Sequence, residues 1–395
     1  MEFKLNEDQQ MIHDLAKDFA ESVLQPRIDE IEAGEMTEVS NGQKHPQLPH
    51  DIHQQLAECG FIGISFPEEY NGMGMGHVEQ AIVIKELSRV SPSVGKCLDV
   101  YILGLEALDL YANHEQKMKY LPDLLSGKKI GAFGLTEPNA GTDASGQQTM
   151  AVREGDHYGL NGSKCFITNG NVADTFVIIA VTGKTTDKRG RAMKEISAFV
   201  VEKTDPGFTQ GKHEKKMGIR GSSTCDLIFE DCVIPKDRML GKKGQGFKIA
   251  MQTLEGGRIG IASQALGLGE GAVEEAVKYT KERVQFGKRI SQFQNTQFQL
   301  AEMHTRMQAA QFLVYSAAMK KQNHEPYSMD AAMAKLFAAD AASDVTRRAV
   351  QLFGGYGYTR EYPVERMMRD AKITEIYEGT SEVQRMVIAS HLGVK

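Results

Sequence analysis

The chain has 395 residues, enough for about two to three domains, and its 41% hydrophobic and 25% charged residues are typical of a folded protein. The 46 Lys and Arg residues against 52 Asp and Glu residues give a formal net charge of −6, so charge supplies no reason to expect binding to nucleic acid or to an anionic membrane. No apolar run approaches the roughly 18 to 20 residues that span a bilayer, so membrane insertion is not expected.

Residues 1–126 are predicted to form an all-α domain, because apolar residues recur at helical spacing over 11–23 and again over 82–90. A polar insert at 35–49 and a glycine-rich loop at 67–76 interrupt this pattern. The first helix is expected from Asn6 onward. Because acids are mixed with the bases there, with neither a secretory nor an Arg-rich presequence, we expect a cytoplasmic protein.

Residues 127–238 are predicted to form a β domain, either a small barrel or a sandwich. The segments 176–181 and 196–201 are short, β-branched and bounded by charged or glycine-containing loops, as strands are. The dipeptide Asn161-Gly162 predicts a hairpin turn, because both positions tolerate a positive φ.

Residues 239–395 are predicted to form a four-helix bundle. The helical period returns in three long runs, at about 244–278, 297–321 and 329–352, and in a fourth helix at 381–391. The fold class is therefore α+β and multidomain, in the order helical, β, helical bundle.

The cysteines and histidines indicate neither a disulfide framework nor a metal site. The five cysteines form no CxxC pair, which favours a reducing compartment. The eleven histidines include no HxH or HExxH pair, so we expect no transition-metal site built from protein ligands.

The window 131–146 is rich in glycine, threonine and serine. Its backbone N–H groups and hydroxyls could bind a phosphate or the edge of a flavin, although such a loop could also simply open the β domain. Within it, the string GLTEPNAGTD at 134–143 is followed by CFITNG at 165–170. This pair closely resembles the flavin-facing segments of acyl-CoA dehydrogenases.

Further strings resemble the same family in its order and at about its spacing: ERVQFG at 282–287, QLFGGYG at 351–357, Arg369-Asp370, and IYEGTS at 376–381. The resemblance is to the short- or medium-chain type, similar to bacterial butyryl-CoA dehydrogenases, and covers nearly the whole chain apart from the insert at 35–49. It implies a helical domain, a β-barrel and a four-helix bundle, assembled as a homotetramer made of two dimers.

The resemblance also implies FAD as the cofactor. Phe166 stands where many relatives have tryptophan, and Thr168 would hydrogen-bond the flavin near N5. Arg283 and Phe286 would reach the cofactor of a neighbouring subunit, alongside Gln351, Gly354 and Gly355. The implied cofactor-binding residues are Phe133, Leu135, Thr136, Gly141, Thr142, Phe166, Ile167, Thr168, Arg283, Phe286, Gln294, Gln351, Gly354, Gly355, Thr380 and Ser381.

The implied reaction is α,β-dehydrogenation of an acyl-CoA thioester to the trans-2-enoyl-CoA. Glu378 would remove the α-proton while flavin N5 accepts the β-hydride, and electrons would pass to an electron-transferring flavoprotein. Some relatives place the base where this chain has Gly257, which has no side chain, so Glu378 alone is assigned as the base. The implied substrate-binding residues are Thr142, Glu255, Arg258 and Gly379. Lys96 and Asp99 are added as candidates because they depart from the family's pattern.

Lys96 and Asp99 lie in a segment, 94–102, where relatives acting on plain short chains have small or neutral residues. Both could face solvent or pair with each other across a helical turn. If Asp99 instead faces the acyl pocket, its charge needs a partner or a raised pKa, which favours a cyclic or functionalised acyl group.

Three alternatives stay open from the sequence. A decarboxylating dehydrogenase of a dicarboxyl-CoA would use Lys96 as the partner of the second carboxylate. An enoyl-CoA reductase would run the reaction in reverse. A catalytically idle flavoprotein could serve as a scaffold or sensor, although the intact loop around Glu378 argues against this.

Overall fold

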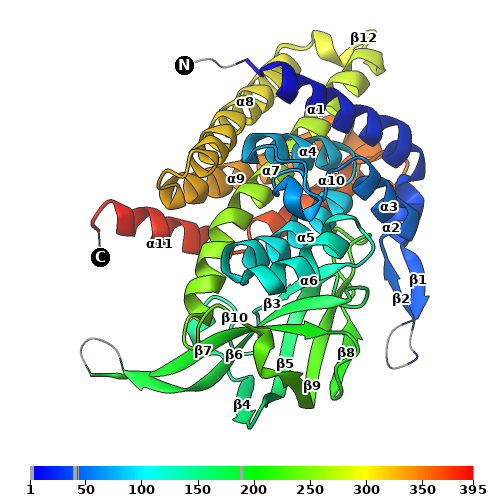
Figure 1. The fold of residues 1–395 in the computed structure, drawn as a ribbon. Helices are drawn as coiled ribbons and strands as arrows, with labels where there is room; N and C mark the ends of the chain where they lie inside the picture. The colour runs from blue at the N-terminus through cyan, green and yellow to red at the C-terminus, as the bar shows by residue number, and fades with distance from the viewer. Residues whose placement is uncertain (1–3, 39–41, 43, 187–189, 395) are drawn as a thin grey trace.

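The computed structural model describes residues 4–38, 42, 44–186 and 190–394. Helices form both ends of the chain, and a β-sheet between them in the sequence lies beneath the helices in Figure 1. In the described part of the chain, no helix combines the length and the apolar character needed to cross a membrane.

The first third is helical, as predicted. Its first helix begins with a capping box, in which Asn6 and Gln9 each accept a hydrogen bond from the other's backbone N–H. The insert at 35–49 contributes two short antiparallel strands, β1 and β2. The elements are α1 (Glu7–Phe19), α2 (Ile28–Ala33), β1 (Glu35–Glu38), β2 (Lys44–Gln47), α3 (His50–Glu58), α4 (His77–Val90), α5 (Pro92–Tyr111) and α6 (His114–Leu125).

The middle third is one eight-stranded sheet in the order β10-β7-β6-β4-β5-β9-β8, with β3 pairing in parallel with β6. The two strands predicted around 176–181 and 196–201 are confirmed as β6 and β7, which pair antiparallel. The strands are β3 (Gly131–Gly134), β4 (Met150–Glu154), β5 (His157–Thr168), β6 (Thr175–Thr186), β7 (Ala192–Glu202), β8 (Phe208–His213), β9 (Thr224–Pro235) and β10 (Met239–Leu240).

The predicted turn at Asn161-Gly162 is wrong. Both residues lie inside β5, and the hairpin between β4 and β5 turns instead at Gly155 and Asp156. The two residues do mark an irregularity, because the pairing of β5 with β9 shifts register there and Gly162 has φ +140°. Glycine at such a position more often marks a bulge than a turn when the strand continues on both sides.

The sheet buries both of its faces. On β6, Val177, Ile179 and Val181 belong to the core shared with the helices. The alternating Phe176 and Ile178 belong to a second core on the other face of the sheet. This period of two is the side-chain alternation of a strand, and it attaches the sheet to the helical part of the molecule through one face.

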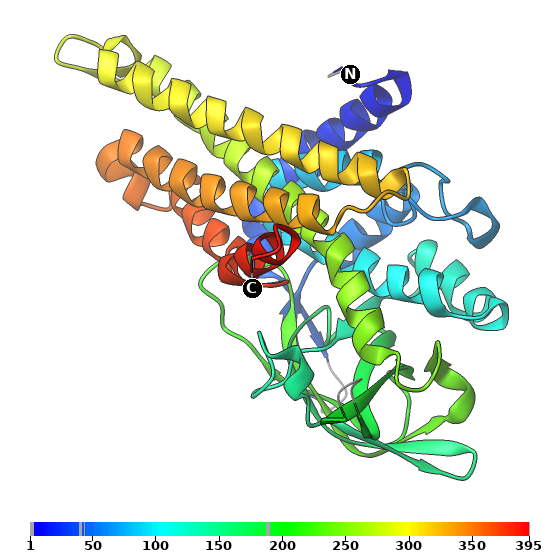
Figure 2. The ribbon, with the colours of Figure 1, turned by 90° about the vertical axis from the view of Figure 1, so that its left-hand side faces the viewer.

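The last third contains five long or medium helices rather than the four predicted. The additional helix, α10, contains the Arg369-Asp370 pair. The long helix α7 packs against α4, α5, α8, α9 and α10 and lies at the centre of the helical part (Figure 2). The elements are α7 (Gly246–Glu282), β11 (Val284–Gln285), β12 (Lys288–Arg289), α8 (Gln294–Gln322), α9 (Ser328–Phe353), α10 (Val364–Thr374) and α11 (Ser381–His391).

A buried ion pair fixes the loop that follows β3. Lys164 on β5 is fully buried, and its Nζ lies 2.7 Å from Glu137 Oε1 and 3.0 Å from Gln147 Oε1. The Glu137 carboxylate also accepts the backbone N–H groups of Gln148 and Thr149 at 2.6 and 3.1 Å. Burial lowers the pKa of Lys164 to about 8, against the opposing effect of Glu137.

Replacing Glu137 with Gln is expected to lower the free energy of unfolding by about 3–5 kcal/mol, because it leaves the buried ammonium of Lys164 without its charge partner. Chemical denaturation measures the change. The matched control is Glu154→Gln, since that side chain is 65% exposed and its loss should change stability by less than about 0.5 kcal/mol. Equal stability of the two variants would contradict this role for Glu137.

Candidate active site

The turn before α11 presents Glu378 in a strained conformation. Glu378 has φ +50° and Gly379 has φ +96°, and a left-handed conformation at a residue other than glycine costs of order 1–3 kcal/mol. Two side chains hold the turn in place, because the Gly379 carbonyl accepts hydrogen bonds from Lys335 Nζ at 2.7 Å and from Gln384 Nε2 at 2.8 Å.

Lys96 and Asp99 on α5 lie beside Glu378 and are each only 2% exposed. Lys96 Nζ lies 2.5 Å from Glu378 Oε1, 3.4 Å from Asp99 Oδ2 and 4.2 Å from the centroid of the Tyr377 ring. The expectation that Lys96 and Asp99 could face solvent is therefore wrong, and the expected pairing across a helical turn is confirmed. Burial, with the nearby charge of Glu378, raises the pKa of Asp99 well above its ordinary value despite the opposing charge of Lys96.

Two glycines of α7 leave room for the carboxyl groups of Glu378 and Asp99 to pack against this helix. A Cβ at Gly257 would lie 2.2 Å from Glu378 Oε2, and one at Gly260 would lie 1.7 Å from Asp99 Oδ1. Any larger residue would collide with the carboxylates, because real Cβ atoms do not approach so closely. Glu378 thus packs against Gly257, the position that cannot supply a base because glycine has no side chain.

The other α7 residues expected at the site lie on the same stretch of helix. Glu255 accepts a hydrogen bond from Ser328 Oγ at 2.7 Å. Arg258 is 6% exposed, and its Nε has no hydrogen-bond partner among the described residues. A buried guanidinium with an unused donor is suited to an anionic or carbonyl ligand.

The two glycine- and threonine-containing segments lie side by side. The backbone N–H of Cys165 donates to the carbonyl of Thr136 at 2.9 Å, which joins the loop after β3 to the end of β5. Phe133, Leu135 and Ile167 are buried, whereas the Phe166 ring is 64% exposed. Of the remaining expected residues, Thr136 and Thr168 are half-buried, and Gly141 and Thr142 are exposed.

An irregularity in strand β5 turns the side chain of Phe166 outward. The pairing of β5 with β9 shifts register between Lys164 and Ile167, and Phe166 has φ +59°. Bulges of this kind redirect side chains and are common next to active sites. The exposed ring of Phe166 fits a flat aromatic ligand such as an isoalloxazine, and the backbone at Gly141 is also open, because a Cβ there would meet no described atom within 4 Å.

The remaining residues expected to bind the cofactor form a second group at the far end of α7. Arg283 and Phe286 lie at the β11–β12 hairpin, away from the sheet in Figure 1, and the Phe286 side chain is 92% exposed. The end of α9 packs here, because Phe353 stacks on Tyr279 with ring centroids 4.0 Å apart. The expected residues in or beside this group are Gln294, Gln351, Gly354 and Gly355, all exposed. Thr380 and Ser381 instead adjoin Glu378 at the start of α11.

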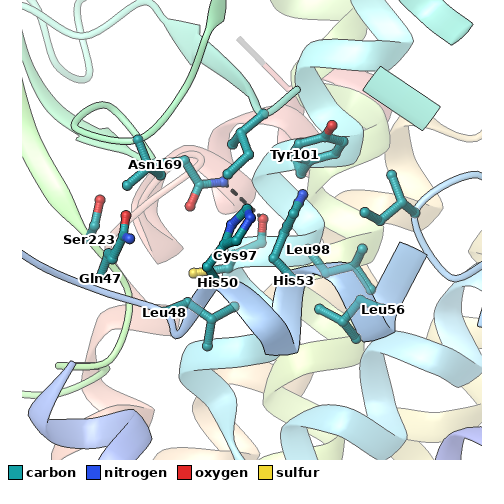
Figure 3. A pocket seen from close by; sticks show the side chains of 13 residues that line it. Gln47, Leu48, His50, His53, Leu56, Cys97, Leu98, Tyr101, Asn169 and Ser223 are labelled. Atoms are coloured by element: carbon teal, nitrogen blue, oxygen red, sulfur yellow. Dashed lines mark hydrogen bonds between the residues drawn. The ribbon is translucent and has the colours of Figure 1, made fainter. Parts of the chain in front are cut away.

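A small cavity of about 30 Å³ lies on the face of α5 opposite Lys96 and Asp99 (Figure 3). Cys97, Leu98 and Tyr101 line it, and at about 100° per residue they point away from Lys96 and Asp99. Asn169 donates to the Cys97 carbonyl at 3.1 Å at its edge. The cavity has room for about one water molecule and is separate from the cluster around Glu378.

The sequence did not identify Lys335 and Gln384 as the side chains that hold the turn at Glu378 and Gly379. A signal did exist for Lys335, which lies in the buried alanine stripe of α9, where a charged residue is unexpected. Burial lowers the pKa of Lys335 to about 8, against the opposing effect of Glu378. Gln384 carried no comparable signal, although its hydrogen bond to the Gly379 carbonyl is local and spans only five positions.

Comparison with known proteins accounts for the whole chain. Three family models match: the acyl-CoA dehydrogenase N-terminal domain at residues 6–128, the middle domain at 132–232 and the C-terminal domain at 244–393. The short-chain specific acyl-CoA dehydrogenase of Clostridium acetobutylicum is 51% identical over 393 residues, covering 99% of this chain and 100% of that protein.

Solved structures agree with the sequence comparisons. Butyryl-CoA dehydrogenase from Megasphaera elsdenii superposes with a TM-score of 0.91 at 46% identity, over 99% of this chain and 100% of that one. A chain in a structure described as the electron-transferring flavoprotein of Acidaminococcus fermentans superposes with a TM-score of 0.91 at 52% identity, over 99% of both chains. With the three domains in the family's order and full-length relatives at about half identity, the chain belongs to the acyl-CoA dehydrogenase family.

Proposed function

We propose that this acyl-CoA dehydrogenase oxidises a short, uncharged acyl group of a CoA thioester to the trans-2-enoyl-CoA, with Glu378 as the base and FAD as the acceptor. The observation that carries the proposal is the presentation of Glu378. Its side chain is 8% exposed, it is held by a strained turn, and it packs against Gly257. Such strain at a buried carboxylate is characteristic of active sites.

The two oxygens of Glu378 have different roles. Oε1 contacts Lys96 Nζ, whereas Oε2 is buried and has no hydrogen-bond partner among the described residues. A carboxylate oxygen without a donor can accept a proton from carbon without first breaking a hydrogen bond. We therefore assign removal of the α-proton to Oε2.

The residues near Phe166 suit the cofactor that the family uses. Phe133, Leu135, Thr136, Gly141 and Thr142 would hold the flavin from the loop after β3, and Phe166, Ile167 and Thr168 from the end of β5. FAD supplies a hydride acceptor when bound. Glu255, Arg258, Thr142 and Gly379 would bind the CoA thioester.

The surroundings of Lys96 favour an uncharged acyl group. A decarboxylating dehydrogenase would need a cation free to bind the second carboxylate of its substrate. Lys96 already has Glu378 and Asp99 as partners, and the described residues 94–102 include no arginine. A further carboxylate would therefore enter a cluster that holds two carboxyl groups already.

The assembly and the electron acceptor extend the proposal. The second group, which includes Arg283, Phe286, Gln294, Gln351, Gly354 and Gly355, would complete the cofactor site of a neighbouring subunit in a homotetramer. The 92% exposed ring of Phe286 supports such a contact, because a large exposed aromatic commonly marks an interface. An electron-transferring flavoprotein would be the redox partner, and reduction of an enoyl-CoA is the same chemistry in reverse.

Replacing Glu378 with Gln is expected to leave the flavin bound but to slow its reduction by butyryl-CoA by about 10²- to 10⁴-fold, because the amide cannot accept the α-proton. Anaerobic stopped-flow absorbance of the flavin measures the rate. Glu382→Gln is the control, since that carboxylate is 79% exposed on α11. Unchanged reduction in Glu378→Gln would rule out this base, and no reduction of the wild type by any ester of a mixed CoA panel would favour an idle flavoprotein.

A substrate panel tests the acyl group. Butyryl-CoA is expected to exceed glutaryl-CoA in kcat/KM by at least about 100-fold, because an added buried carboxylate without a cation costs several kcal/mol. Release of CO₂ from glutaryl-CoA at a comparable rate would contradict the uncharged pocket. Cyclohexanecarboxyl-CoA belongs in the same panel, since brisk turnover of butyryl-CoA with none of the cyclic ester would exclude a cyclic substrate.

Replacing Lys335 with Met is expected to lower kcat by about 10- to 100-fold, because the Gly379 carbonyl loses a donor and the adjacent Glu378 loses its fixed position. Steady-state kinetics with saturating substrate measure the effect. The control is Lys320→Met, whose ammonium pairs with Asp330 at the surface end of α8. A wild-type kcat in Lys335→Met with reduced thermal stability would assign Lys335 a purely structural role.

A further inference from the structure

The ammonium of Lys96 is the nearest cation to the proposed base. Its Nζ lies 2.5 Å from Glu378 Oε1, and both side chains are nearly excluded from solvent, at 2% and 8% exposure. Asp99 Oδ2 lies 3.4 Å from the same Lys96 Nζ. The titratable and charged groups that face this pair are Asp99 and Glu106 on α5, Arg258 on α7, Lys335 on α9 and Tyr377 in the turn before α11.

Lys96 pairs more closely with Glu378 than with Asp99, at 2.5 Å against 3.4 Å. Burial and the charge of Glu378 raise the pKa of Asp99 well above its ordinary value, which disfavours a second charged carboxylate in the cluster. A buried charge without a partner is strongly destabilising, so the contact with Lys96 is the one that compensates Glu378.

We propose that Lys96 is a positioning residue for the base, which supplies the cation beside Glu378 and holds its Oε1 so that Oε2 is directed along Gly257. The inference rests on the proposed function, because it assigns Lys96 a role only if Glu378 removes the proton. Lys96 itself does not exchange a proton with the substrate.

A cation within hydrogen-bond distance stabilises the charged form of a carboxylate relative to its neutral form. Lys96 Nζ, 2.5 Å from Glu378 Oε1, is placed to supply that cation. The same contact leaves Oε2 as the oxygen of Glu378 without a hydrogen-bond partner among the described residues.

Replacing Lys96 with Met tests the proposal through the pH profile of kcat/KM for butyryl-CoA. The acid limb is expected to move to higher pH by about one to three units, because Glu378 loses the cation that favours its charged form. A structural role for Lys96 would lower the amount of active enzyme without moving the limb. An acid limb at the wild-type pH would overturn the proposal.

Lys85→Met is the matched control. Lys85 is also buried, at 6% exposure, and pairs with Glu86 at 2.7 Å and with Glu270 at 3.4 Å. Glu270 lies about 20 Å along α7 from Gly257, given 1.5 Å per residue. This variant is expected to lose thermal stability and to keep the wild-type acid limb. If Lys85→Met moves the limb as far as Lys96→Met does, the specific role of Lys96 is refuted.

A second measurement does not depend on turnover. Glu378→Gln introduced into Lys96→Met is expected to raise the midpoint of thermal unfolding, because it removes a buried carboxylate that has lost its cation. The same change in the Lys85→Met background should not raise it. Equal effects of Glu378→Gln in all backgrounds would show that Lys96 and Glu378 do not interact and would overturn the proposal.

Failure of this inference is distinguishable from failure of the proposed function. If Glu378→Gln is still reduced by substrate at the wild-type rate, Glu378 is not the base and the proposed function fails. If Glu378→Gln is inactive while Lys96→Met keeps the wild-type acid limb, the base is correct and only the role of Lys96 is refuted.

Discussion

The close approach of α7 to α5 and to the turn before α11 is the constraint on which the rest of the site depends. Gly257 and Gly260 leave room for two carboxyl groups against the helix surface, where a single methyl group would collide with either one. Carboxyl groups packed this tightly are removed from water and need a cation close by. Lys96 meets that need from α5, so close packing and charge compensation form one requirement rather than two.

Two of the described non-glycine residues with positive φ, Glu378 and Phe166, lie in the site, and side-chain or strand contacts hold each of them. Lys335 and Gln384 hold the carbonyl next to Glu378, and the register shift of β5 against β9 turns Phe166 outward. Strained conformations persist only when surrounding contacts over-determine them, so these contacts are part of the chemistry.

Helix α5 links the two halves of the site. Nearly every residue of α5 up to Leu108 is buried, and one face bears Lys96 and Asp99 toward Glu378. The opposite face bears Cys97, whose carbonyl accepts a hydrogen bond from Asn169 just beyond the end of β5 that carries Phe166. A shift of this helix would therefore move the base cluster and the segment around Phe166 together. The rigidity of a buried helix keeps their relative positions fixed.

The order of helical, β and helical segments followed from the sequence, because side-chain periods of 3.6 and 2 are local properties of the chain. The sequence was less decisive at Asn161-Gly162, because a turn and a bulge both favour a residue that tolerates a positive φ. Only the pairing of β5 with β9 decides between them. Helix α10 was not predicted, although with 11 residues it is as long as α11, which was.

Motifs in the sequence identified Glu378 and Phe166 as candidates, since a run of residue types is visible without coordinates. The sequence also flagged Lys96 and Asp99 as out of place but left open whether they face solvent. Only the tertiary structure decided that they are buried, that Lys96 contacts Glu378, and that Lys335 fixes the turn. These contacts join residues up to 282 positions apart in the sequence. The packing of the helices brings them together, rather than any local preference of the chain.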